Sequence, residues 1–113
     1  MSVNNQHVVV WEFLVVAGRE ADFEDTYGPR GEWAQLFAAS NDFLGTELLR
    51  NSLQPSRYVT LDRWTSEAGF SRFHEAHAAA YAALDAECER LTESEIARDT
   101  WTPVPSQTAG RER

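Results

Sequence analysis

Proton transfer is the first chemistry that this sequence suggests, because a histidine lies on the apolar stripe of its longest predicted helix. An imidazole at that position, His77, could accept a proton near neutral pH inside a cavity. The structural alternative is a core histidine bonded to a neighbouring backbone group or hydroxyl. Tyr81 lies one turn later on the same stripe. Its phenol could position a substrate hydroxyl, or the ring could be an ordinary part of the core.

Two further candidates lie at the end of the predicted strand before this helix. Trp64 could stack on a planar substrate and donate its N–H to a developing oxyanion, or it could anchor the strand to the helix. Asp62 shares the face of Trp64 by period-two alternation. A carboxyl on an apolar face could have a raised pKa and act as a base. The commoner alternative is a salt bridge, for which Arg50, Arg63 and Arg72 are available.

A second histidine, His74, lies one turn before His77, and this spacing can place two imidazoles near one metal ion. A third ligand would have to come from elsewhere, for instance Asp62. With three histidines and one cysteine in the chain, we expect no metal site, and we place His74 at the helix edge, either at the lip of a pocket or in solvent. We expect Tyr27 and Trp33 to cap that pocket, with ordinary helix packing as the alternative.

Alternating and helical hydrophobic patterns define the elements that must position these residues. Ser66 is a plausible N-cap for the longest helix, whose apolar stripe contains Phe70, Phe73 and His77. Strands are predicted over 7–16, 43–52, 57–65 and 95–102, and helices over 19–27, 32–39 and 67–91. This order, βαββαβ, predicts an α+β, ferredoxin-like fold in which a four-stranded antiparallel sheet carries the helices on one face.

The first predicted strand is apolar on both faces. Val9, Trp11 and Phe13 point to one side, whereas Val8 and Val10 point to the other. Helices can cover only one of these faces. A bare apolar sheet face is rarely left exposed in a soluble monomer, and a second copy of the sheet is its simplest cover. We therefore expect a homodimer.

Composition excludes several classes of function. The net charge of −8 disfavours nucleic acid and anionic membranes as partners. All ten basic residues are arginine, so lysine Schiff-base and P-loop chemistry are absent. The longest apolar stretch, residues 8–17, contains Glu12 and is too short to span a bilayer, and no signal peptide is evident at the N-terminus. We expect a cytoplasmic protein with one domain over 7–102, an N-terminal tail over 1–6 and a disordered C-terminal tail over 103–113.

The segment Thr60-Leu-Asp-Arg-Trp-Thr-Ser-Glu-Ala68, followed by histidines on the helix, resembles the antibiotic biosynthesis monooxygenase family. The resemblance covers roughly residues 7–101. It implies a dimeric α/β barrel with a ligand cavity between sheet and helices in each subunit. The family includes cofactor-free oxygenases of aromatic polyketides and quinols as well as haem-degrading enzymes. The haem-degrading pattern is not matched, since its three positions correspond here to Trp11, Phe73 and Ala83.

The resulting hypothesis is a cofactor-independent oxygenase that acts on a hydroxylated, polyketide- or quinol-like aromatic molecule. His77 would be the base and Trp64 the oxyanion donor, with Asp62 as a third catalytic candidate. A non-oxidative cyclase or isomerase and a non-catalytic small-molecule-binding dimer are the alternatives. The residues expected to bind the substrate are Phe13, Tyr27, Trp33, Phe70, Phe73, His74 and Tyr81.

Overall fold

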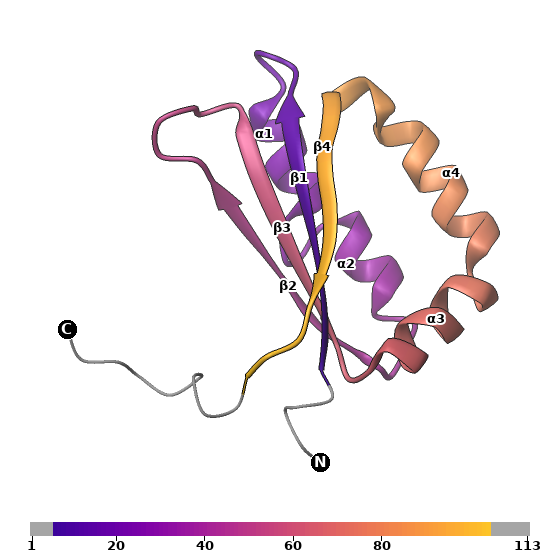
Figure 1. The fold of residues 1–113 in the computed structure, drawn as a ribbon. Helices are drawn as coiled ribbons and strands as arrows, with labels where there is room; N and C mark the ends of the chain where they lie inside the picture. Colours follow the sequence, from indigo (N-terminus) through magenta and orange to yellow (C-terminus); the bar gives the residue numbers. More distant parts are fainter. Residues whose placement is uncertain (1–5, 105–113) are drawn as a thin grey trace.

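The computed structural model describes residues 6–104 and has the predicted order of strands and helices (Figure 1). The predicted tails, 1–6 and 103–113, fall almost entirely outside this range. The four strands form one antiparallel sheet in the order β2-β3-β1-β4. The elements are β1 (His7–Val15), α1 (Glu20–Tyr27), α2 (Glu32–Phe37), β2 (Phe43–Arg50), β3 (Arg57–Trp64), α3 (Glu67–Ala76), α4 (Ala78–Cys88), the 3₁₀ turn η2 (Glu89–Leu91) and β4 (Thr92–Trp101).

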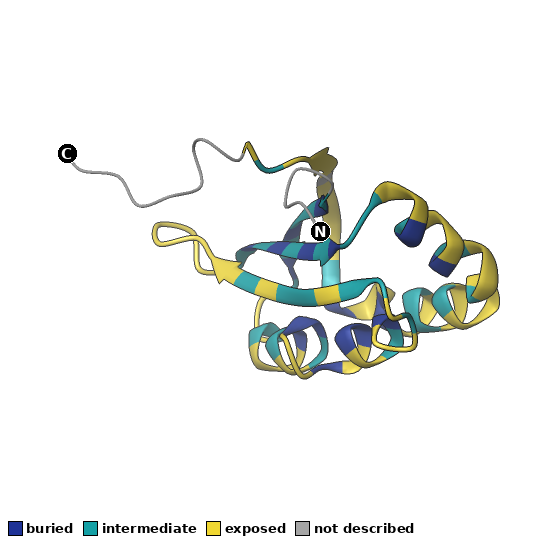
Figure 2. Cartoon of the chain, turned by 90° about the horizontal axis from the view of Figure 1, so that it is seen from below, coloured by how far each residue is buried: buried dark blue, intermediate teal, exposed yellow. Residues whose placement is uncertain are grey.

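The core lies between the sheet and the helices. Along β3, Tyr58, Thr60, Asp62 and Trp64 are buried, whereas the residues between them are partly exposed. This alternation places Asp62 and Trp64 on one face, as predicted, and the structure shows that the helices cover this face. Figure 2 shows that α3 and α4 are exposed over much of their surface, in contrast to the buried segments of the sheet and of α1 and α2.

The prediction of one continuous helix over 67–91 is wrong. Ser66 caps α3 as expected, because its hydroxyl accepts a 3.0 Å hydrogen bond from the Gly69 amide. The helix then breaks at His77, whose backbone angles are φ −123° and ψ 27°, and α4 continues in a different direction (Figure 1). Residues 70–91 contain neither proline nor glycine. Tertiary packing, rather than local propensity, therefore sets the break.

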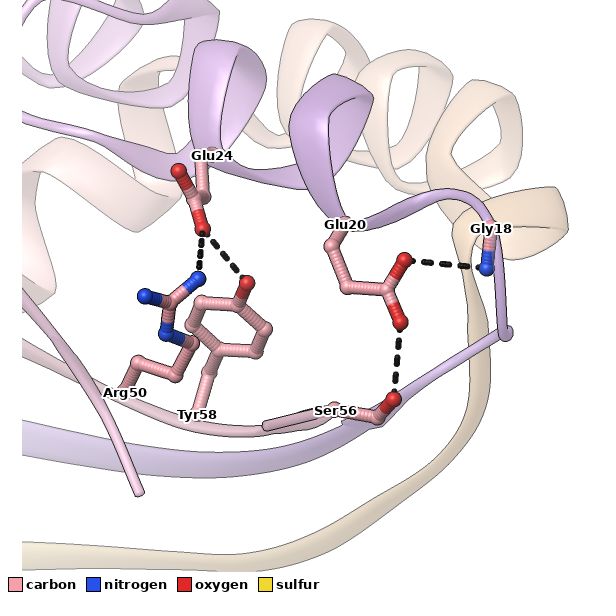
Figure 3. A network of polar contacts seen from close by, with 6 residues as sticks. All are labelled: Gly18, Glu20, Glu24, Arg50, Ser56 and Tyr58. Atoms are coloured by element: carbon pink, nitrogen blue, oxygen red, sulfur yellow. Dashed lines mark hydrogen bonds and ion pairs between the residues drawn. The ribbon is translucent and has the colours of Figure 1, made fainter. Parts of the chain in front are cut away.

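A polar network joins α1 to the sheet (Figure 3). Glu24 accepts a 2.6 Å hydrogen bond from the phenol of Tyr58 and forms an ion pair with Arg50 at 3.3 Å. Glu20 accepts hydrogen bonds from the Ser56 hydroxyl and the Gly18 amide. These contacts fix the helix over the sheet and so hold the aromatic residues of α1 in place.

The face of the sheet opposite the helices is apolar at its centre. We call it the open face; it contains Val8, Val10, Leu49, Val59, Leu61 and Trp101, which line a groove of about 660 Å³. Ion pairs between Arg57 and Glu12 and between Arg63 and Glu47 flank these residues. An apolar centre with a charged rim is the usual anatomy of a protein–protein interface. Within residues 6–104, no helix is long and apolar enough to cross a bilayer.

Candidate functional site

Two adjoining hollows lie between the sheet and the helices, and they share Trp11, Phe37, Asp62 and Tyr81 in their walls. The larger, the main cavity, measures about 220 Å³ and is completed by Val9, Phe70, His74 and Arg98. The smaller, the narrow extension, measures about 30 Å³ and is completed by Phe13, Tyr27, Trp33, Thr60, Asp85 and Glu95. Aromatic walls with a few polar groups are typical of sites for planar organic ligands.

Asp62 is the buried carboxyl of this site. Only 7% of the residue is exposed, and none of the arginines proposed as partners lies within ion-pair distance in the described chain. Burial raises the pKa of Asp62 to about 6, while the hydrogen bond from the Thr46 hydroxyl partly offsets this shift. The carboxyl is therefore ionised at neutral pH but basic enough to take a proton.

Two neutral groups, Tyr81 and His74, share the wall of the main cavity with this carboxyl. The Tyr81 ring lies 4.7 Å from the His74 ring and 4.9 Å from the Trp33 ring, between centroids. Burial raises the pKa of Tyr81 to about 12, so its phenol stays protonated and can donate a hydrogen bond. Burial and the nearby Arg98 lower the pKa of His74, which favours the neutral imidazole.

Arg98 supplies the positive charge of the site. It is opposite Trp11 in the β1–β4 register, and its guanidinium carbon lies 5.9 Å from the Trp11 ring centroid and 5.7 Å from that of Phe70. These are cation–π distances. The cation is therefore held beside the aromatic walls of the main cavity.

Seven of the ten predicted site residues line the two hollows: Phe13, Tyr27, Trp33, Asp62, Phe70, His74 and Tyr81. His77, Trp64 and Phe73 are not part of either wall. His77 lies at the α3–α4 junction, where its ring stacks on Phe73 with a centroid separation of 4.9 Å. Trp64 is fully buried, and its indole nitrogen has no hydrogen-bond partner within the described residues.

The predicted set lacked seven polar or aromatic residues of the site: Trp11, Phe37, Thr46, Thr60, Asp85, Glu95 and Arg98. The alternation of β1 already placed Trp11 on the face of Phe13, so that signal was available. Arg98 and Glu95 lie on β4, whose pairing with β1 is interrupted by register shifts. Simple alternation therefore could not have placed them. Among residues 6–104, no group of three or more His, Cys, Asp or Glu side chains is arranged to hold a metal ion.

The fold and site together define a small α+β domain with an aromatic cavity between a four-stranded sheet and its helices. The family model for antibiotic biosynthesis monooxygenase (ABM) matches residues 6–86, and this chain belongs to that family. Among proteins with curated descriptions, none matches the sequence.

Solved structures confirm the fold. SnoaB from Streptomyces nogalater, described as a cofactor-independent oxygenase, superposes with a TM-score of 0.74 at 21% identity, over 93% of this chain and 99% of that one. A putative antibiotic biosynthesis monooxygenase from Bordetella bronchiseptica superposes with a TM-score of 0.65 at 24% identity, over 88% and 98%. MupZ from Pseudomonas fluorescens gives 0.69 at 12% identity, over 88% and 74%.

Proposed function

We propose that this protein is a cofactor-independent oxygenase of a hydroxylated aromatic small molecule, with Asp62 as the catalytic base. The observation that carries the proposal is a buried carboxyl with a pKa of about 6 in an aromatic-walled cavity. A base of that strength is largely ionised at neutral pH and can still accept a proton from a phenol or enol whose anion the site stabilises.

We prefer Asp62 to His77 as the base because of where the two side chains lie relative to the cavity. Asp62 borders both hollows, whereas His77 borders neither and packs on Phe73. A base must come within hydrogen-bond reach of the proton that it removes. His74, in the wall of the main cavity, can assist by accepting a hydrogen bond as a neutral imidazole.

The reaction needs only the substrate and dioxygen. Asp62 removes the phenolic or enolic proton, and the electron-rich anion transfers one electron to dioxygen. The substrate radical and superoxide combine to form a C–O bond, and protonation gives a hydroperoxide. Loss of water from a carbon that still bears hydrogen yields a carbonyl, so one oxygen atom enters the product and the other leaves as water. The substrate supplies all four electrons that dioxygen consumes.

Two donors are available for the substrate oxyanion. Trp33 lines the narrow extension and is only 7% exposed. Its indole N–H lies beside the Tyr27 phenol and the Cys88 thiol but forms no hydrogen bond of normal length and angle in the described chain. The Tyr81 phenol is the second donor. We therefore assign to Trp33 the donor role that the sequence suggested for Trp64. Trp64 is enclosed by four phenylalanine rings, Phe37, Phe43, Phe70 and Phe73. A preorganised donor aimed at a developing oxyanion typically changes a rate by two to three orders of magnitude.

Oxygen uptake by the purified protein tests the proposal. Anthrone or a naphthohydroquinone serves as substrate, with no cofactor added. We expect turnover in the native protein, loss of roughly two orders of magnitude or more in Asp62→Asn, and near-native turnover in His77→Ala. Turnover without oxygen uptake would instead indicate a cyclase or isomerase that uses the same base. Binding without turnover would indicate a non-catalytic ligand-binding protein.

We also propose that a second copy of the chain covers the open face. Val8, Val10 and Leu61 lie at its centre, and Trp101, which is 59% exposed, lies at its edge. An exposed apolar patch rimmed by ion pairs favours a protein partner. A two-fold related sheet offers the same surface in return, which is the simplest way to cover it.

A further inference from the structure

Helix α4 forms part of the cavity wall, yet little of its own surface is buried. Tyr81 lines both hollows, and Asp85 lines the narrow extension. Of the eleven residues of α4, only Cys88 is buried and seven are exposed, in line with the largely exposed ribbon of α4 in Figure 2. A helix that covers a core usually buries a continuous apolar stripe. Burial therefore stabilises the position of α4 less than is usual for a covering helix.

Polar contacts do not compensate for this shallow packing. On α1, by contrast, Glu24 binds both the Tyr58 phenol and the Arg50 guanidinium (Figure 3). No ion pair within residues 6–104 involves α4. Its buried polar contact is at the C-terminal end, where the Cys88 thiol lies beside the Tyr27 phenol. A segment with few buried contacts and few polar ties opens at a lower free-energy cost than the whole fold.

The space between α4 and β4 is lined by like charges. Asp85 on α4, Glu89 in η2 and Glu95 on β4 form what we call the acidic edge. They line a hollow of about 230 Å³ whose six lining residues include no basic side chain. Partial burial, and then the nearby Asp85 carboxylate, raise the pKa of Glu95. Repulsion between Asp85 and Glu95 therefore opposes the approach of α4 to β4.

The junction between α3 and α4 sets the angle between the two helices. His77 has non-helical backbone angles there, φ −123° and ψ 27°. Its amide donates to the Phe73 carbonyl and its carbonyl accepts from the Tyr81 amide, each at 2.9 Å. The backbone hydrogen bonds of α3 and α4 thus continue on either side of His77. A rotation of α4 relative to α3 would be absorbed by a few backbone angles near this residue.

We propose that α4 is the gate of the cavity: it turns about the His77 junction, away from β4, to admit a ligand. Repulsion within the acidic edge lowers the cost of opening. Closure returns the Tyr81 ring to its position 4.9 Å from the Trp33 ring and restores the cavity wall. This inference rests on the proposed function in one respect, since it takes the cavity to hold a ligand.

Hydrogen exchange of the free protein, followed by mass spectrometry, tests the gate without any ligand. In the native protein, α4 amides should exchange about tenfold or more faster than α1 amides, after correction for intrinsic rates. Glu95→Arg replaces repulsion of Asp85 by attraction and should slow exchange in α4 about fivefold, with α1 unchanged. Glu95→Gln removes the repulsion alone and should slow it about twofold.

Glu93→Arg is the matched control, because it makes the same change of charge on the same strand. Glu93 is exposed and lies outside the walls of the three hollows. Its substitution should leave exchange in α4 at the native rate. Equal exchange in α1 and α4 of the native protein, or equal effects of Glu93→Arg and Glu95→Arg, would overturn the inference.

Ligand-binding rates provide the second test. The probe is a dihydroxyanthraquinone, which is already oxidised, and binding is followed by stopped-flow quenching of tryptophan fluorescence, because Trp11 and Trp33 line the site. A gate controls both entry and exit. Glu95→Arg should therefore lower the association and dissociation rate constants by the same factor, about fivefold. A change in the dissociation rate constant alone would show that Glu95 acts as a ligand contact and would overturn the gate.

The two proposals can fail separately. If exchange in α4 responds to Glu95→Arg but no hydroxylated aromatic compound causes oxygen uptake, the oxygenase proposal fails and the gate stands. If oxygen is consumed but α4 is as well protected as α1, the gate fails and the oxygenase proposal stands.

Discussion

The Thr46 hydroxyl on β2 donates a 2.7 Å hydrogen bond to Oδ1 of Asp62, the residue that faces it across the β2–β3 register. This hydrogen bond is the only one that the Asp62 side chain makes with the described residues. It favours the ionised carboxylate, whereas burial favours the protonated acid, and burial dominates. The Thr46–Asp62 pair therefore sets the strength of the proposed base.

Removing the Thr46 hydroxyl should raise the pKa of Asp62. The carboxylate then becomes a stronger base, but a smaller fraction of it is ionised at a given pH. In the native protein, turnover should rise with pH through about 6 and then level off. Thr46→Val should move this midpoint upward by about one pH unit, since a hydrogen bond to a charged group contributes about 1.5–3 kcal/mol. Thr46→Ser keeps the hydroxyl and should restore the native profile. An unchanged midpoint in Thr46→Val would contradict the assignment of Asp62.

The pH dependence of the free energy of unfolding should also reflect the ionisation of Asp62. Its pKa is raised from 3.8 to about 6 in the folded protein, so folding favours the protonated form. This stabilisation of the folded state is fully present below the pKa that Asp62 has in the unfolded chain. It is lost as the pH rises through the pKa that Asp62 has in the folded protein. Asp62→Asn remains neutral, and its stability relative to the native protein should increase by about 2 kcal/mol between about pH 4 and about pH 8.

Urea unfolding of both proteins at the two pH values measures this difference. Asp42→Asn is a useful comparison of opposite sign, because hydrogen bonds from Thr65 and Arg72 lower the pKa of Asp42. A stability difference between Asp62→Asn and the native protein that does not change with pH would show that the carboxyl is not perturbed by burial.

The indole N–H of Trp33 should contribute to turnover rather than to binding. Trp33→Phe removes the donor and leaves an aromatic ring in the wall, so kcat should fall by about tenfold or more while KM changes little. Trp64→Phe is the matched control, because Trp64 lies outside both cavity walls. It should lower the unfolding temperature and leave kcat nearly native. The opposite pattern would return the donor role to Trp64.

A charge at the centre of the open face should prevent self-association. Leu61→Glu introduces an unpaired carboxylate among Val8, Val10 and Val59, and burying it in an interface would be costly. We expect a dimer for the native protein and a folded monomer for the variant by sedimentation analysis. Leu53→Glu, at a 90% exposed loop position, should remain dimeric. A native protein that is monomeric at all concentrations would contradict the proposed dimer.

The period-two alternation of side chains along the strands predicted the parts of the structure that depend on a strand's two faces. The two apolar faces of β1, the β2–β3 hairpin and the common face of Asp62 and Trp64 all follow from it. The same rule divided the residues of each strand between two faces, but it could not show which face the helices cover. These features are local to one strand or one hairpin, which is why the sequence contains enough information to place them.

The remaining features depend on tertiary packing. The stripe that contains Phe73, His77 and Tyr81 has helical spacing whether or not the helix bends, so its periodicity could not reveal the break at His77. That break separates His77 from the cavity while Tyr81 stays in its wall. Arg98 was omitted for a related reason, since the register shifts between β1 and β4 are not encoded in an alternating pattern.

Product analysis with isotopically labelled dioxygen tests the central claim most directly. The native protein, supplied with anthrone and no added cofactor, should form a product that has gained one labelled oxygen atom, with the second recovered as water. Asp62→Asn should form this product at a rate lower by roughly two orders of magnitude, whereas His77→Ala should form it at a nearly native rate. A product without the label, or an undiminished rate in Asp62→Asn, would contradict the account.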